Sequence, residues 1–276
     1  PSESKERSLI VLPLANLSND AAQEFFADGM TDELISQLMR AGSLHVFSRT
    51  TAMTFKGGNK PIAQIARELK ADWVVEGAVL HDGNRVRISA RLIDASAERN
   101  LWAQSYERDV RNVLELQCEV AGAIAREIRL RVAPDIQLQP TESRPVNPDA
   151  YLTYLRARYF WNKRTAEDLR RAVACFRQSI DQDPTYSPAY AGLSDAYMLL
   201  GSMGYDAMPP KEAMPLAKAA ASQALLLDES SAEAHASLAH VMFAFEWTWN
   251  DAEREFKDRK STRLNSSHVA LSRMPS

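Results

Sequence analysis

The stretch Ala189-Tyr-Ala-Gly-Leu-Ser-Asp-Ala-Tyr197 returns 45 residues later as Ala234-His-Ala-Ser-Leu-Ala-His-Val-Met242. The same offset joins Ala172 to Ala217. Both copies lie in Ala-rich sequence with a helical pattern, and a unit that recurs at a fixed period of this length indicates helix pairs stacked into an array. The repeat therefore predicts an α-solenoid in the second half of the chain.

The first half of the chain alternates between strand and helix patterns. Residues 9–14 form a continuous apolar run, typical of a strand buried on both faces. Gly83-Asn84 lies between two strand-like runs and predicts a hairpin. The expected elements are strands at 9–14, 44–48, 71–80, 85–93 and 100–106, and helices after Gly29, after Pro61 and over 113–132. This pattern predicts an α/β domain with a mixed β-sheet and packed helices.

These patterns divide the chain into segments. The prolines between 134 and 148 indicate a stiff linker, and an extra-long connection within the second helix pair is expected at 201–210. The last residues lack an apolar stripe and resemble translated sequencing-adapter read-through, so we interpret them as a non-native tail. The segments are a linker at 1–7, an α/β domain at 8–133, a Pro-rich linker at 134–147, about three helix-pair repeats at 148–257 with the last incomplete, and the tail at 258–276.

Composition narrows the class of protein. The chain has 276 residues, 45% of them hydrophobic and 25% charged, which is typical of about two globular domains. No apolar run is long enough to span a bilayer. A net charge of −3 argues against direct nucleic-acid contact, which needs a concentrated excess of Lys and Arg.

The second half resembles the tetratricopeptide repeat family. The residues that fit the second-helix pattern of small, aromatic, small and proline are Ala172, Phe176, Ser179 and Pro184, and those that fit the next first helix are Tyr190, Leu193, Ser194 and Tyr197. The resemblance implies helix pairs that form a concave groove for a protein or peptide partner.

The first half resembles the amino-terminal domain of TolB and its TolB-like relatives. The stretches that carry this are Ile10-Val-Leu-Pro-Leu-Ala-Asn-Leu-Ser18, Phe26-Ala-Asp-Gly-Met-Thr-Asp-Glu-Leu34 and Ala71-Asp-Trp-Val-Val-Glu-Gly77. Such a domain followed by tetratricopeptide repeats resembles the sensory half of one-pass bacterial signalling proteins. Their other half is a CadC-like winged-helix domain, a nucleotide cyclase or a receptor-type kinase. The resemblance implies a periplasmic location, with a cytoplasmic one as the alternative, and membrane contact only through an upstream anchor.

Several polar groups are candidates for chemical sites. Asp28, Asp32 and Glu33 could form a metal or acid/base cluster, but their place at an expected helix start favours capping. A row of arginines at 85, 87 and 91 could bind an anion, although a solvated strand face is the simpler interpretation. No motif for a nucleophile, metal or phosphate is present. We therefore predict no catalytic residue, metal site or cofactor.

The groove of the helical array is the remaining candidate site. The positions that the tetratricopeptide resemblance places on its inner surface carry aromatic, Arg and Met side chains suited to holding a peptide. They are Tyr154, Trp161, Arg164, Asp195, Met198, His240 and Phe243. The alternative is that these side chains only pack neighbouring helices.

The sequence thus predicts a non-catalytic regulatory or sensory module that binds a protein or peptide. One alternative is a structural scaffold or adaptor in an envelope or cytoplasmic assembly. Another is a small-molecule receptor, for which the sequence shows no convergent polar cluster. Because the last repeat is incomplete, its aromatic residues should stay partly uncovered and promote self-association.

Overall fold

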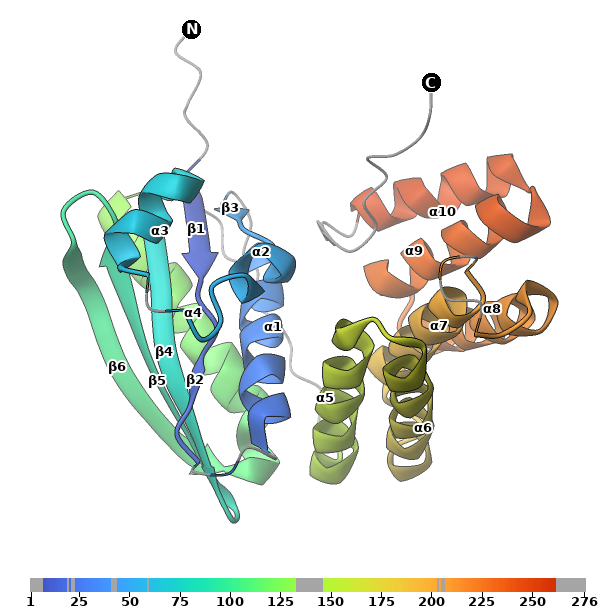
Figure 1. Ribbon diagram of the computed structural model, residues 1–276, viewed down its shortest axis with the longest axis horizontal. Coiled ribbons are helices and arrows are strands. Elements are labelled where there is room, and N and C mark those ends of the chain that lie inside the picture. The colour runs from blue at the N-terminus through green and yellow to red at the C-terminus, as the bar shows by residue number, and fades with distance from the viewer. Residues whose placement is uncertain are drawn as a thin grey trace, which may run out of the picture. The chain divides into compact units, whose positions relative to one another are not determined.

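The structure is a computed structural model that describes residues 7–18, 20, 23–40, 44–58, 60–132, 146–202, 204 and 207–261. The chain divides into two compact units, residues 1–144 and 145–276. The first unit combines a sheet with helices and the second is helical (Figure 1). This confirms the predicted fold class, a mixed sheet domain followed by an α-solenoid.

One mixed sheet forms the centre of the first unit, with strand order β3-β1-β4-β5-β6 and β2 beside β4. The strands are β1 Ser8–Val11, β2 Ala15–Asn16, β3 His45–Val46, β4 Trp73–Asp82, β5 Arg85–Asp94 and β6 Arg99–Asp109. β1 runs parallel to both of its neighbours, whereas β4, β5 and β6 are antiparallel. All four residues of β1 are buried, but the strand ends at Val11, so only the first half of the predicted strand at 9–14 forms.

The predicted hairpin joins β4 to β5. Asp82 pairs with Arg85 across the turn, and Gly83 has a φ of 55°, a conformation that glycine adopts without steric cost. Along β5, Val86, Ile88 and the following apolar residues are buried, while arginines on the opposite face are exposed. One face of this part of the sheet therefore meets the core and the other meets solvent.

Helices cover the sheet. They are α1 Glu24–Arg40, α2 Arg49–Met53, α3 Ile62–Leu69 and α4 Val113–Val132, the last preceded by the short helix η2 Val110–Asn112. α1 and α4 pack against each other, with α4 on β5 and β6 and α1 on β1 to β4 (Figure 1). Leu116, Val120, Ile124 and Ile128 form the buried stripe of α4, at the spacing of one helix face.

Two helices differ from the sequence expectation. α1 begins at Glu24, upstream of Gly29, so the prediction that residues 31–33 cap it is wrong. Burial of Phe25, Phe26 and Met30 at helical spacing extends the helix upstream. The short helix α2 was not predicted; the Ser48 side chain caps it by accepting from the Thr51 N–H.

The second unit contains three helix pairs. The first helices are α5 Pro148–Lys163, α7 Ser187–Leu200 and α9 Ala232–Val241, and their partners are α6 Ala166–Gln182, α8 Pro210–Leu227 and α10 Trp249–Ser261. A π-helical turn, η3 Met242–Glu246, continues α9. Asn147, Thr165 and Ser231 cap α5, α6 and α9 with side-chain oxygens, which is why each helix starts where it does.

Short serine side chains tie the helices within a pair. The Ser179 hydroxyl of α6 donates to the Ala150 carbonyl of α5 at 2.8 Å. Two hydroxyls of α7, those of Ser187 and Ser194, donate to carbonyls of α8 at 3.0 and 2.7 Å. All three serines are buried, so each bond satisfies a polar group that water does not reach.

Successive pairs are tied by longer side chains. Arg177 of α6 donates to the Tyr197 hydroxyl of α7, and Lys218 of α8 binds Glu246 of η3 at 2.7 Å. Gly192 lets α7 approach α6, because a Cβ at this position would overlap the buried ring of Phe176. A close glycine contact and two side chains with charged ends are thus among the contacts that join successive pairs.

The ends of the segments predicted from sequence are described only in part. α10 continues to Ser261, three residues beyond the predicted tail start at 258. Most of the predicted linkers at 1–7 and 134–147, and residues 262–276, lie outside the described residues. None of the helices that the structure describes is long and apolar enough to cross a membrane.

Candidate partner-binding surface

The acidic residues of the first unit form an ion-pair stripe along α1. Glu24 and Asp28 bind the Lys56 ammonium at 2.7 and 2.6 Å, and Asp32 lies 4.0 Å from the Arg49 guanidinium. These three acids are spaced four residues apart, so they share one helix face. The capping interpretation of Asp28 and Asp32 is thus wrong: their carboxylates hold α2 and the following turn against α1.

Ion pairing also shifts the pKa values of Glu24 and Lys56 in this stripe. The hydrogen bond from Lys56 lowers the pKa of Glu24, against the opposing effect of burial. Burial lowers the pKa of Lys56, but the hydrogen bonds to Asp28 and Glu24 outweigh it and the net pKa is raised. Both shifts favour the ionised forms of Glu24 and Lys56, which suits a structural role rather than proton transfer.

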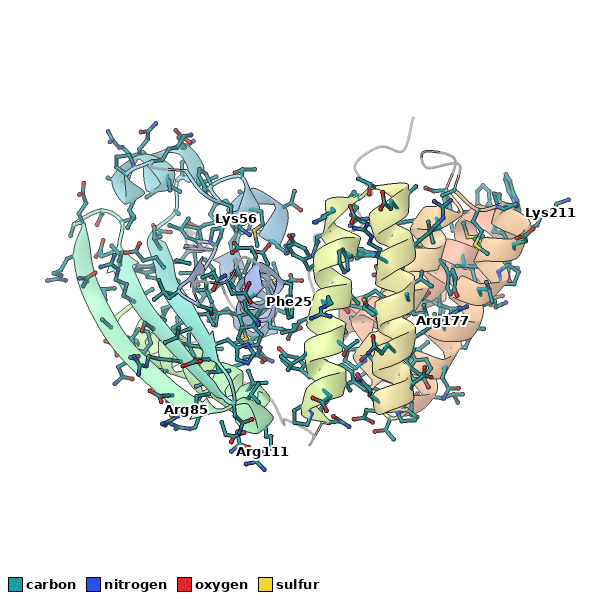
Figure 2. The ribbon with its side chains drawn as sticks, turned by 60° about the horizontal axis from the view of Figure 1, so that its bottom comes forward. Phe25, Lys56, Arg85, Arg111, Arg177 and Lys211 are labelled. Atoms are coloured by element: carbon teal, nitrogen blue, oxygen red, sulfur yellow. The ribbon has the colours of Figure 1, made fainter. Side chains whose placement is uncertain are left out.

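The arginines of the row on β5 pair with glutamates on the neighbouring strands. Arg85 and Arg87 bind the two carboxylate oxygens of Glu107 on β6 at 2.8 and 2.7 Å, and Arg91 pairs with Glu76 on β4. Figure 2 shows Arg85 at the end of the unit where Arg111 also lies. The row is therefore a solvated ladder in which three arginines share two glutamates.

A cluster of charged and aromatic groups lies where α5 ends. Arg164 is the C-cap of α5 with a φ of 57°, and its guanidinium lies 3.7 Å from the centre of the Trp161 ring. The guanidinium of Arg158, one turn earlier, lies 4.9 Å from the same ring. Contacts of this kind combine cation–π attraction with stacking. Trp161 is only 3% exposed and so serves as a platform that orients both arginines.

Asp195 on α7 links this cluster to the third pair. Its carboxylate accepts a hydrogen bond from the Ser237 hydroxyl of α9. Burial raises the pKa of Asp195 to about 6; the hydrogen bond from Ser237 opposes this, the charge of Glu233 adds to it, and Arg158 and Arg164 lower it. The carboxylate therefore lies among groups from all three first helices.

The structure places the predicted groove residues in two environments. Trp161, Arg164 and Asp195 belong to the cluster just described. Tyr154 is 3% exposed and packs in the interior against Phe176 and Tyr186, so its ring is not presented to a partner. Packing of the first two helix pairs around this aromatic ring explains why it turns inward.

Three further predicted positions lie near the surface. Met198 and His240 are half-buried, and burial lowers the pKa of His240. Phe243 is exposed and contacts the Trp249 ring at 5.8 Å. These positions continue the first-helix face on α7, α9 and η3.

Two members of the cluster were missed from the sequence. Arg158 stands three residues before Trp161, a helical spacing that could have marked it. Ser237 lies 42 residues after Asp195, and no local pattern relates the two. The cluster is more polar than the sequence predicted.

An aromatic patch lies at the end of the third pair. Trp247 and Trp249 are 71% and 58% exposed, and their rings stack with centres 6.4 Å apart. Trp247 has a φ of 60°, which is uncommon for a bulky residue. Together with Phe243, these rings form an exposed aromatic patch.

Among the residues that the structure describes, no three His, Cys, Asp or Glu side chains could together hold a metal ion. His235 is engaged in structure: its Nδ1 lies 2.7 Å from Glu255 and its Nε2 lies 2.9 Å from the Glu229 carbonyl. It joins α9 to α10 and to the turn before α9.

Known proteins resemble both units. Residues 4–122 match the family described as HilA/YgeH-like transcriptional regulator, second domain. The matched residues span most of the first unit, from before β1 to the middle of α4. It is 32% identical over 187 residues to "Putative adenylate cyclase 3" of Rhizobium meliloti (strain 1021), covering 68% of this chain and 32% of that protein.

Two further similarities, at lower identity, are to a transcriptional regulator and to a solved structure. The chain is 23% identical over 177 residues to "Transcriptional regulator HilA" of Salmonella typhimurium, covering 63% of this chain and 31% of the relative. It thus spans about a third of the length of these curated relatives. The solved structure "Second TPR of Spaghetti (RPAP3) bound to HSP90 peptide SRMEEVD" is 21% identical, with a TM-score of 0.34 over 41% of this chain and 92% of that one.

Proposed function

We propose that this chain is the non-catalytic sensory part of a bacterial regulatory protein and that its helical array binds a protein or peptide. The observation that carries the proposal is the cluster that spans the first helices of all three pairs, in which Arg164 and Asp195 are half-buried and open to a partner. The buried Arg158, Trp161 and Ser237 hold these two side chains in place. Arg164, stacked on Trp161, and the Asp195 carboxylate offer a partner a positive and a negative group close together, and arginine is enriched among the residues that anchor protein interfaces.

The relatives support a regulatory rather than a catalytic role. The shared segment covers about a third of a protein named as a putative adenylate cyclase and of a protein named as a transcriptional regulator. Because those two names imply different outputs, a segment common to both is better suited to input than to catalysis. We propose that the output domain, of CadC-like winged-helix, cyclase or kinase type, belongs to another part of the protein.

The location and further contacts follow from the same proposal. We place the module in the periplasm, as the extracytoplasmic part of a protein anchored upstream, with a cytoplasmic location as the alternative. It makes no direct nucleic-acid contact, needs no cofactor, and can self-associate through the aromatic patch at its last repeat.

Site-specific photo-crosslinking in cells that produce the protein tests the partner proposal. A photoreactive residue at Met198, on the first-helix face, should give a discrete adduct with a partner. The same residue at Leu226, which is 81% exposed on α8, is the matched control. Arg164→Glu should reduce the adduct at 198 several-fold while thermal unfolding stays cooperative.

Two results would contradict the proposal. One is equal labelling at both positions, which indicates random collision. The other is an adduct that Arg164→Glu leaves unchanged. The scaffold alternative is favoured if Arg164→Glu abolishes the adduct without altering any regulatory output of the whole protein.

A further inference from the structure

The described residues at the end of the long connection inside the second helix pair lie beside the end of α7. α7 ends at Leu200 and α8 begins at Pro210, so the intervening segment is longer than a tight helix–helix turn. The Met208 N–H donates to the Leu200 carbonyl at 3.1 Å. Gly201 allows this close return, because a Cβ there would lie 2.6 Å from the Ala213 side chain.

The folded connection closes one side of a groove of about 270 Å³. The groove differs from the first-helix face described above: none of the residues of the Arg158 cluster lines it. Its lining residues are Arg170, Val173 and Arg177 of α6, Tyr197 and Leu200 of α7, Ala207 and Met208 of the connection, and Leu216 of α8.

The floor and walls of this groove are apolar. Val173, Leu200 and Met208 are buried or half-buried, and Leu216 is 39% exposed at the rim. The volume is smaller than the roughly 300–1,000 Å³ of most small-molecule sites. It suits one or two aliphatic side chains of a polypeptide.

Two arginines on the rim carry uncompensated charge. The Arg170 guanidinium donates to the Ala207 carbonyl at 3.0 Å, and Arg177 donates to the Tyr197 hydroxyl and lies over its ring. These acceptors are neutral, and among the described residues neither arginine forms a salt bridge. Arg177 is labelled on α6 in Figure 2. The rim is therefore positive, with donors already held in place.

We propose that this groove is a second docking site, for an acidic amphipathic helix of a partner protein. An aliphatic side chain of the helix enters between Val173 and Leu216, and carboxylates on either side bind the two arginines. Arg170 and Arg177 are seven residues apart, or about 10.5 Å along α6, so the matching acids lie about two turns apart. The apolar contact supplies affinity and the charges supply orientation.

The test uses the whole chain and a synthetic helical peptide. The peptide carries Leu on one face with Glu two turns apart on either side, and a fluorophore reports binding by anisotropy. We expect saturable binding that weakens with added salt. A peptide with Lys in place of Glu, and one with Ser in place of Leu, should bind at least about tenfold more weakly.

Matched variants of the chain locate the binding. Leu216→Ser should weaken binding several-fold, whereas Leu226→Ser, the same change on the same helix outside the groove, should not. Arg177→Glu should weaken it about tenfold, while Lys211→Glu, the same charge reversal at the exposed start of α8, should have little effect. Arg177→Gln keeps a donor for the Tyr197 hydroxyl and should give an intermediate loss without unfolding.

Three outcomes would overturn the proposal. The first is no saturable binding of the Glu/Leu peptide by the folded chain. The second is equal weakening by Leu216→Ser and Leu226→Ser. The third is dimerisation that Leu216→Ser abolishes in the absence of peptide binding, which would make a second copy the occupant. Arg164→Glu, on the first-helix face, should leave peptide binding unchanged, so failure here is separable from failure of the proposed function.

Discussion

Replacing Asp195 by Asn should stabilise the protein at neutral pH. Burial raises the pKa of Asp195 from 3.8 to about 6, so the charged carboxylate is disfavoured in the folded state. At about 1.4 kcal/mol per pKa unit, the shift gives an upper bound of about 3 kcal/mol. The carboxylate is half-buried and partly screened by water, so we expect a gain of roughly 1–2 kcal/mol.

The raised pKa of Asp195 also determines how the folding stability should change with pH. A folded-state pKa above the unfolded value means that the folded protein binds the proton more tightly, so stability falls as pH rises between about 4 and 6 and then levels off. The asparagine side chain of the variant does not titrate. Asp195→Asn should therefore match the parent protein near pH 4 and exceed it above pH 6.

Urea unfolding followed by far-ultraviolet circular dichroism measures the difference at several pH values. Asp181→Asn is the control, because Asp181 is exposed on α6, and its effect should stay within about 0.5 kcal/mol. If Asp195→Asn instead destabilises the protein at neutral pH, Asp195 is a net stabilising partner of Arg158 and Arg164. That result would refute the interpretation that burial makes the charged form of Asp195 a net cost to the folded state.

Other substitutions test packing, pairing and association. Gly192→Ala should cost about 1–3 kcal/mol in urea unfolding, since its methyl group would overlap a buried ring; full stability would mean that α7 shifts freely on α6. Lys56→Met should cost about 1–3 kcal/mol because it leaves the buried Asp28 carboxylate unpaired, whereas Lys60→Met, which breaks an exposed pair, should cost under about 1 kcal/mol. Trp247→Ser should lower the apparent mass in light scattering at high concentration, and a strictly monomeric parent protein would contradict self-association through the aromatic patch.

The regular parts of the fold could be predicted from local sequence. The helix pairs could be predicted because an Ala-rich stretch recurs later in the chain. The hairpin could be predicted from Gly83-Asn84 and from the alternation of apolar and polar residues along β5. The start of α1 could not be predicted in this way. Thr31 and Asp32 carry the residue types of a cap, but the Thr31 hydroxyl donates to the Ala27 carbonyl inside the helix and Asp32 faces Arg49. Contacts between distant segments override the capping signal there.

The contacts of the candidate site also fall into two groups, those that local sequence predicts and those that depend on packing between helices. Trp161 and Arg164 lie on one helix end, and their spacing of three residues suffices to bring them together. The inward turn of Tyr154 depends on Phe176 and Tyr186 from two later helices, and the bond between Asp195 and Ser237 depends on how α9 stacks on α7. Such relations come from packing between helices, which single-helix periodicity does not encode.

The contrast between ties within and between helix pairs has a mechanical consequence. A serine side chain is short, so its hydrogen bond to a backbone carbonyl allows little relative movement. The helices α7 and α8 should therefore move as one rigid body. An arginine or lysine can change its rotamer and keep its bond, so the contact of Arg177 between the first two pairs should allow small rotations. Lys218 gives the same freedom between the second and third pairs, where the short Ser237–Asp195 bond limits it. The array would then consist of rigid helix pairs with more compliant contacts between them. A partner that spans two pairs could change the curvature of the array without breaking any bond inside a pair.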